Sequence, residues 1–334
     1  MAVIPEAVRE TETSRRIEAA GLKRVYQGKV RDTYKHPRDP RKLVVVATDR
    51  ISIFDVVLPT PVPQKGAVLT ALTHFWLTCV LANFRHHLLT FPFDRAEMVH
   101  SALPVKQTLV VWKLPIVPFE MIFRGHIGGS VWVQYQETGM VAGRLLPPDL
   151  AKWQQLDFPI FTPSTKAEEG HDANITVQEF FENTEGFGER AASALQEAYE
   201  LAYAYARRMG ILILDTKFEI GLRPGGQVVI ADEVLTPDSS RFTTMEDLEK
   251  ALKEGRDPVF YDKEPVRNWG RTVDTPAGRG INLLDPKNPE HLAFVASLEV
   301  PREIMEQTTE RYLDIFQRLT GMSLEQYQKE RMGL

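Results

Sequence analysis

Apolar and polar residues alternate in several short segments, and this alternation predicts β-strands. Two of them, "ILILDTKFEIGL" (211–222) and "QVVIADEVL" (227–235), flank the turn residues of "RPGGQ" and predict a hairpin. Two apolar runs with a polar centre over 42–58 predict a strand, a functional turn and a second strand. Residues 108–125 are strand-like but contain Pro115 and Pro118, which suit a stiff hinge between two lobes.

Longer apolar-rich stretches have the spacing and end signals of helices. Thr176 and Glu179 have the spacing of a capping box and predict the start of a short helix. Four further helices are predicted over 66–84, 188–210, 243–255 and 301–321. Because strands come in hairpin-like groups with helices between the groups, the pattern favours an α+β fold over a doubly wound parallel sheet. We expect a β-rich N-terminal lobe over 1–116 and a second lobe over 117–334, ending in a helical segment.

Composition narrows the class of protein. The chain has 334 residues, 43% of them hydrophobic, and a net charge of −5, which gives no general reason to expect a nucleic-acid partner. It has no apolar run of the ~18 residues that a membrane span needs, and its N-terminus lacks the apolar region of a signal peptide. The single cysteine, Cys79, lies in an apolar helical stretch and predicts a buried, inert thiol, which suits a reducing cytoplasm.

The predicted hairpin brings carboxylates together. If Gly225 and Gly226 form a two-residue turn, Glu219 lies directly opposite Asp232, with Cβ atoms about 5 Å apart. Asp215 shares a strand face with Glu219, because residues two apart point the same way. Facing carboxylates repel, so a raised pKa, a basic partner or a divalent cation is required. Mg²⁺, which leaves positions for phosphate and water, is favoured; a solvated outer face or a slipped register remains the alternative.

Four other segments combine groups that bind anions or polar substrates. Arginine and lysine can hold phosphate or carboxylate, and glycines expose backbone N–H groups to a ligand. These segments are "YQGKVRDTY" with Lys29 and Arg31, "RGHIGGSVW" with Arg124 and Ser130, "TPDSSRF" with Asp238, Ser240 and Arg241, and "TPSTKAEEGHDANIT" with Lys166 and Asp172. Taken singly, each could be an ordinary solvated strand edge, glycine loop or turn. No Walker A, G-x-G-x-x-G or G-x-S-x-G motif is present, so the constellation favours ATP-dependent chemistry without a protein nucleophile.

In this order along the chain, the segments resemble the SAICAR synthetase family of de novo purine biosynthesis. The matching stretches are "GKVRDTY", "DRISIFD", "PQKGAVLTALTHFW", "FRGHIGGS", "FTPSTKAEEGHDANIT", "LDTKFEIG", "ADEVLTPDSSRF" and, less closely, "EPVRNW". The resemblance implies that ATP, the carboxyaminoimidazole ribonucleotide CAIR and L-aspartate give SAICAR, ADP and phosphate. It also implies an N-terminal lobe with an antiparallel sheet and a C-terminal ATP-grasp-like lobe, with ATP between them.

The resemblance also implies roles for individual residues. ATP and Mg²⁺ would be bound by Lys29, Arg31, Glu120, Lys217, Glu219 and Asp232, with Glu219 and Asp232 as the metal ligands. CAIR and aspartate would be bound by Asp49, Ser52, Asp55, Arg124, Ser130, Lys166, Asp172, Asp238, Ser240, Arg241 and Arg267. Asp215, Lys217 and Arg241 would lie at the reacting centre. The segment "KLPIVPFE" would be the hinge against adenine. The chain departs from the family's usual residues at Ile53, His126, Gly128 and Thr243.

Two other functions remain open at this point. One is a phosphotransferase of similar form that phosphorylates a small molecule and stops there. The other is a nucleotide-binding regulatory protein without catalysis. Phosphate release that requires aspartate would distinguish the ligase from both. The expected partners are small molecules, with no nucleic acid and no membrane, in a monomer or homodimer.

Overall fold

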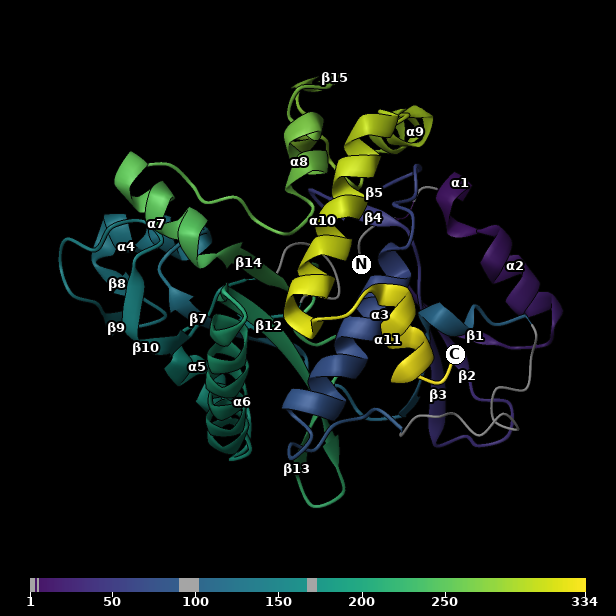
Figure 1. The fold of residues 1–334 in the computed structure, drawn as a ribbon, viewed down its shortest axis with the longest axis horizontal. Coiled ribbons are helices and arrows are strands. Elements are labelled where there is room, and N and C mark those ends of the chain that lie inside the picture. Colours follow the sequence, from purple (N-terminus) through teal and green to yellow (C-terminus); the bar gives the residue numbers. More distant parts are fainter. Residues whose placement is uncertain (1–3, 5, 90–101, 167–172) are drawn as a thin grey trace. The chain divides into compact units, whose positions relative to one another are not determined.

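The computed structural model describes the whole chain except residues 1–3, 5, 90–101 and 167–172 (Figure 1). The described chain forms two compact units. The first contains 1–74, 88–113 and 262–334, and the second contains 75–87 and 114–261. The change of unit after Lys113 falls in the predicted hinge segment. The expected division differs at the C-terminus, because residues from Asp262 onward belong to the first unit and not to the second.

The first unit is built on a four-stranded antiparallel sheet in the order β1-β2-β3-β6. Its strands are β1 (Arg24–Gln27), β2 (Arg31–Lys35), β3 (Lys42–Ala47) and β6 (Thr108–Trp112). Alternate residues such as Tyr34, Val44 and Val110 are buried in one cluster with Ile17 of α2 (Glu12–Ala19). The sheet therefore buries one face under an N-terminal helix, which follows α1 (Glu6–Arg9).

A second core of the first unit explains why the C-terminal residues belong there. The hairpin of β4 (Ile51–Ile53) and β5 (Val56–Leu58) is buried together with Val266, Ile281, Val295 and Met305 from the C-terminal part. Besides α1 and α2, this unit contains α3 (Lys65–Phe75, whose last residue falls in the second unit), α8 (Glu264–Gly270), α9 (Pro289–Ser297), α10 (Arg302–Thr320) and α11 (Leu324–Glu330). A small hairpin, β15 (Asp274–Thr275) and β16 (Gly278–Arg279), and a short 3₁₀ turn (Ile281–Leu283) complete the C-terminal part.

The second unit is built on a six-stranded antiparallel sheet around the long strand β12 (Ile211–Arg223). The main order is β10 (Gln155–Phe161), β7 (Phe119–His126), β12 and β13 (Gln227–Ala231), with β11 (Ser164–Thr165) paired to β7 and β14 (Ser240–Thr244) paired to β12. Helix α6 (Gly188–Arg208) runs along the sheet, and its buried Tyr199 donates a hydrogen bond to the carbonyl of Ile213 at 2.6 Å (Figure 1). Shorter elements are α4 (Ser130–Thr138), α5 (Val177–Glu182), α7 (Met245–Glu254), β8 (Met140–Val141) and β9 (Arg144–Leu145).

Most predicted helices are confirmed, including the capping box of Thr176 and Glu179. The helix expected over 66–84 is shorter, because α3 passes into a π-helical turn (Trp76–Val80). A π turn takes extra residues per turn and so rotates the apolar stripe. Cys79 is consequently exposed, and the prediction of a buried thiol was wrong.

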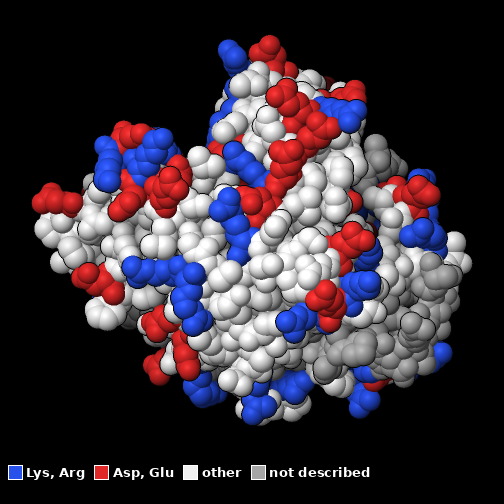
Figure 2. All heavy atoms as spheres, in the orientation of Figure 1, with Lys and Arg blue, Asp and Glu red and all other residues white. Residues whose placement is uncertain are grey.

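The structure is an α+β fold, as expected. Within the described residues, no helix combines the length and the apolar character that a bilayer crossing requires. Lys and Arg are interspersed with Asp and Glu on the face drawn in Figure 2, and are not gathered into one broad basic region.

Candidate functional site

One face of β12 carries the charged residues that the sequence singles out. Thr216, Phe218 and Ile220 alternate with them and are fully buried on the opposite face. Asp215 and Lys217 therefore share a face, as period-two geometry predicts. On this face of the second unit, charged side chains of β7, β12 and β14 meet Lys166, which follows β11.

Three of these charges form a row across adjacent strands. Asp215 of β12 lies directly opposite Arg124 of β7 and Arg241 of β14. The Arg124 Nη1 atom donates to Asp215 Oδ2 at 2.6 Å, and Arg241 Nη1 donates to the same oxygen. The Arg124 side chain is 5% exposed and the Asp215 side chain 8%. Burial lowers the pKa of Arg124, and the Asp215 charge opposes this effect. Two guanidinium groups around one carboxylate leave one positive charge for an anionic ligand.

Arg241 lies beside the first turn of α4. The backbone of Gly129 has φ 64°, and a Cβ atom there would lie 2.9 Å from Arg241 Nη1, so only glycine allows this approach. Gly129 is the N-cap of α4 and supplies no side-chain cap, and Ser130 is the exposed first residue of the helix. Helix N-termini carry N–H groups without intrahelical partners. Together with Arg241, they form an anion-binding arrangement.

The same sheet face holds two lysine–carboxylate pairs. The Lys217 ammonium group lies 2.5 Å from Glu120 Oε2, and the Ser164 hydroxyl donates to the same carboxylate oxygen at 3.3 Å. The Lys166 ammonium group lies 2.6 Å from Glu219 Oε2. The structure thus brings both lysines to carboxylates of this face.

The predicted register of the hairpin was wrong by one residue. Glu219 lies opposite Ala231, because the loop contains Pro224 as well as the two glycines and Arg223 pairs with Gln227. The Gly226 N–H group closes this turn on the carbonyl of Arg223 at 3.1 Å. Glu219 and Asp232 are therefore not a directly opposed pair, and their mutual repulsion no longer argues for a metal.

Asp232 nevertheless has a notable position. It follows the last residue of β13 and has φ 59°, a conformation that is uncommon for a non-glycine residue. Such backbone strain is typical of functional sites. No group of three His, Cys, Asp or Glu residues close enough to hold a metal occurs in the described part of the chain. Two carboxylates fit Mg²⁺ only where phosphate oxygens and water complete its six ligands, and that is how Mg²⁺ usually binds with nucleotides.

In the first unit, Lys29 lies in a turn between two strands. Residues 28–30 connect β1 and β2, and the Gly28 N–H group donates to the Arg31 carbonyl at 2.7 Å. The Arg50 side chain fixes this turn through the carbonyls of Gly28 and Lys29, at 3.0 and 3.1 Å. Arg50 is held in turn by the buried carboxylate of Asp32, at 2.6 Å.

Lys29 also reaches the neighbouring hairpin. Its ammonium group lies 2.6 Å from Asp55 Oδ1, an exposed pair. Phe54 and Asp55 form the two-residue turn between β4 and β5, with φ of 48° and 65°. Such a turn needs positive φ at both positions, which a bulky phenylalanine rarely adopts. Lys29 and Asp55 are therefore presented at the tips of two adjacent turns of the first unit.

The structure also places the other predicted residues of this unit. Asp49 accepts hydrogen bonds from the Gly66 N–H group at 2.8 Å and from Gln107 at 3.0 Å, so it caps the start of α3. Burial raises the pKa of Asp49. Ser52 is buried in β4, and Arg31 lies on β2 opposite Ala47. Arg267 donates to Asp262 at 3.1 Å.

Some predicted residues are not brought to the charged face. The Ser240 hydroxyl is buried and lies 2.7 Å from the hydroxyl of Thr216, on the opposite face of the sheet. Asp238 is in the turn before β14, where its N–H group donates to Thr236 at 3.3 Å. Asp172 lies outside the described residues.

The sequence reasoning missed two residues that shape the site. Arg50 was part of a matching segment but had no role assigned, and its partner Asp32 is distant in the sequence. Trp153 stands in a polar stretch and lies against Arg241, with the guanidinium carbon 5.7 Å from the indole centroid. It also accounts for one departure from the family's usual residues, because a Cβ atom at Gly128 would lie 2.1 Å from its ring.

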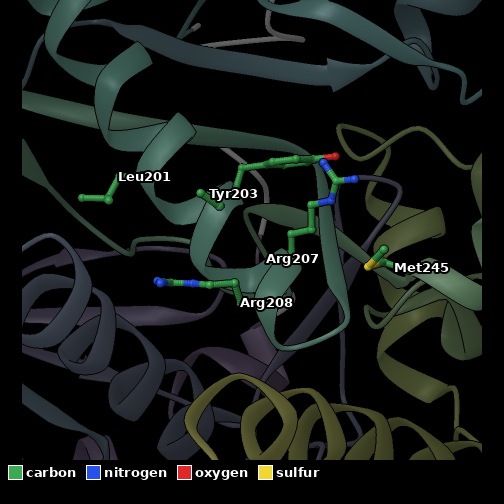
Figure 3. Close-up of a pocket in the computed structure, with 6 residues that line it drawn as sticks. Leu201, Tyr203, Arg207, Arg208 and Met245 are labelled. Carbon is green, nitrogen blue, oxygen red and sulfur yellow. The ribbon is translucent and has the colours of Figure 1, made fainter.

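A separate surface groove of about 630 Å³ lies between α6 and the start of α7. Leu201, Tyr203, Arg207, Arg208 and Met245 line it, and Tyr203 points toward Arg207 while Arg208 points away (Figure 3). The Tyr203 hydroxyl is 3.1 Å from His126 Nε2, and His126 Nδ1 is 2.9 Å from the Trp153 carbonyl oxygen. Burial lowers the pKa of His126. These contacts connect the groove to Trp153 but add no charged group to the sheet face.

Comparisons with known proteins agree on one family. A family profile described as SAICAR synthetase matches residues 24–282. The phosphoribosylaminoimidazole-succinocarboxamide synthase of Methylobacillus flagellatus is 39% identical over 90% of this chain and 95% of its own length. The Stenotrophomonas maltophilia enzyme is 38% identical over 91% and 96%. Among solved structures, the SAICAR synthase of Saccharomyces cerevisiae complexed with SAICAR has a TM-score of 0.76 and 33% identity, covering 95% of this chain and 99% of the other.

Proposed function

The chain belongs to the SAICAR synthetase family, and from this membership we propose that it joins CAIR and L-aspartate in an ATP-dependent reaction. The products would be SAICAR, ADP and phosphate. The name of the yeast neighbour, which is complexed with SAICAR, supports this product. The structural observation that carries the proposal is the row Arg124–Asp215–Arg241 beside two lysine–carboxylate pairs on one sheet face.

The chemistry requires activation of a carboxylate. The CAIR carboxylate oxygen takes the γ-phosphoryl group of ATP, which releases ADP and leaves an acyl phosphate. The aspartate amine then attacks the acyl carbon, the C–O bond to phosphate breaks, and phosphate leaves as the amide forms. The amine loses a proton to solvent or to a base. Positioning and charge stabilisation supply most of the rate in such phosphoryl transfers.

We assign the anionic end of CAIR to the arginine row. Arg241 is 31% exposed and can turn its remaining donors to a phosphate or carboxylate, while buried Arg124 fixes Asp215. Ser130 and the first turn of α4 add neutral donors. Asp215 accepts from both guanidinium groups, so taking a proton would weaken two charge-assisted bonds. This favours Asp215 as a residue that positions the arginines, and not as the base.

We assign the nucleotide to the lysine–carboxylate pairs. Lys217 can exchange Glu120 for a phosphate oxygen, and Glu120 then keeps the Ser164 hydroxyl. Glu219 and Asp232 would hold Mg²⁺, which when bound neutralises phosphate charge. Lys166 lies where it can neutralise Glu219 before nucleotide binds. In the first unit, the Arg50-braced turn would present Lys29 and Arg31 to phosphate.

Formation of ADP tests the proposal directly. We expect ADP only when CAIR and aspartate are both present with ATP, together with one phosphate and one SAICAR per ADP. ADP formation with CAIR alone, without any dependence on aspartate, would instead indicate a phosphotransferase. Nucleotide binding without ADP formation under all three conditions would indicate a regulatory protein and contradict the proposal.

A further inference from the structure

We propose that Trp153 is a positioning residue that holds the Arg241 guanidinium group at the anion site. This inference rests on the proposed function, because that function gives Arg241 its ligand. Arg241 has an oxygen of Asp215 on one side and the Trp153 ring on the other, 5.7 Å from the guanidinium carbon to the ring centroid. A guanidinium group on an aromatic face is attracted to it and loses freedom to turn.

Trp153 is itself held firmly. Its N–H group donates to the Ile127 carbonyl at 2.6 Å, and its carbonyl oxygen is 2.9 Å from His126 Nδ1. The indole Nε1–H group donates to Asp257 at 2.7 Å. These bonds use the backbone and side-chain polar groups of Trp153, and its backbone has φ 67°, which an unconstrained tryptophan rarely adopts. The ring therefore has one orientation before any ligand arrives.

The surroundings leave the ring no room to move. It is 3% exposed, and Phe260 packs edge-on against it at 5.1 Å between centroids. On the Gly128 side, an added Cβ atom would lie 2.1 Å from the indole. Gly128 and Gly129 thus allow two adjacent close approaches, the first to Trp153 and the second to Arg241. Trp153 fills the space into which Arg241 could otherwise swing.

Loss of the Trp153 ring would weaken the binding of CAIR without changing the charge of the site. Without the indole, Arg241 keeps its charge and its bond to Asp215 but gains rotational freedom. Fixing the Arg241 side chain when CAIR binds then costs conformational entropy, which lowers the affinity for the anion. ATP, assigned to the lysine–carboxylate pairs, does not depend on this ring.

Three substitutions, two of them also combined, test the inference. In Trp153→Leu, we expect the KM for CAIR to rise about tenfold, with the KM for ATP within about twofold of the wild type. In Trp153→Phe, most of the CAIR affinity should return, because an aromatic face remains. Introduced into the wild type, Gly128→Ala should raise the KM for CAIR, because the added methyl group displaces the ring. Introduced into Trp153→Leu, the same substitution should have little further effect on this KM.

The alternative is a purely structural tryptophan. Thermal melting of the same variants separates the two, since a structural role lowers Tm without changing the ratio of the two KM values. Equal rises of both KM values, an unchanged KM for CAIR, or additive effects of Gly128→Ala and Trp153→Leu would overturn the inference. If the wild type forms no ADP with CAIR and aspartate, the proposed function fails. Inorganic phosphate then serves as the probe: it should raise Tm in the wild type and in Trp153→Phe but not in Trp153→Leu, and equal shifts would overturn the positioning role.

Discussion

The Asp215→Asn variant tests the central ion-pair row. Asp215 is the shared acceptor of Arg124 and Arg241, and the Arg124 side chain is only 5% exposed. The amide keeps the size of the carboxylate and one acceptor oxygen, but it removes the negative charge between two guanidinium groups. Arg124 would then be a buried cation whose side-chain acceptors, the amide oxygen and the Thr162 hydroxyl at 2.9 Å, carry no charge.

The expected loss of stability follows from burial. Removing one partner of a buried ion pair typically costs about 3–5 kcal/mol. Because asparagine retains one hydrogen-bond acceptor, we expect roughly 3 kcal/mol, at the lower end of that range. For a unit of this size, this corresponds to a fall in Tm of about 6–12 °C. Calorimetry or a dye-based melt would measure it in the transition that reports the second unit.

The same carboxylate-to-amide change at an exposed pair provides the control. Glu254 pairs with Arg256 in the same unit, and its side chain is 46% exposed. Glu254→Gln should therefore change stability by less than about 1 kcal/mol. If Asp215→Asn melted within 2–3 °C of the wild type, roughly the shift expected for 1 kcal/mol, the reasoning about a buried, shared counter-ion would be refuted.

Three further predictions concern binding and pH. Asp232→Asn should keep the Tm but require at least about tenfold more Mg²⁺ for half-maximal ADP formation, since an anionic ligand is lost; an unchanged Mg²⁺ titration would exclude Asp232 as a ligand. Arg241→Lys should raise the KM for CAIR about tenfold with little change in the KM for ATP, because an ammonium group cannot form the planar fork; equal KM values in variant and wild type would contradict this. Burial lowers the folded-state pKa of His126 below 6.5. As the pH falls, the unfolded chain therefore takes up this proton before the folded chain does. The stability contributed by neutral His126 is present above pH 6.5 and is lost as the pH falls below it. His126→Gln should lose less Tm than the wild type between pH 7 and 5, and parallel curves would argue against the assignment.

Local signals in the sequence predicted much of the fold. Alternation and helix-end residues located most elements, because they depend on neighbours within a few positions. The hairpin also followed from Gly225 and Gly226, but its register did not. A turn of two residues and a turn of three share the same glycines, and the inclusion of Pro224 moved Asp232 out of opposition to Glu219. A shift of one residue is enough to exchange the faces of a strand.

The site was predicted in part for the same reason. Asp215 and Lys217 share a face because strand geometry is local, whereas Ser240 was assigned to the site although its hydroxyl points to the other side. The contacts of Arg50 and Trp153 could not be predicted, because their partners lie far away in the sequence. The composition of the segment does not predict the positive φ of Trp153. Gly128 is the sequence feature that relates to Trp153, because the ring beside it leaves no room for a side chain.

At the proposed nucleotide site, the lysine–carboxylate pairs would make ligand binding an exchange of partners. Lys217 and Lys166 each already neutralise an acid, Glu120 and Glu219 respectively. A phosphate that pairs with one of these lysines leaves the carboxylate without its counter-charge. That carboxylate then favours the binding of another cation. A nucleotide carrying its own divalent ion restores the balance in one event, whereas either component alone leaves one charge uncompensated. The affinity for the combined pair should consequently vary less with ionic strength than the number of charges on this face would suggest.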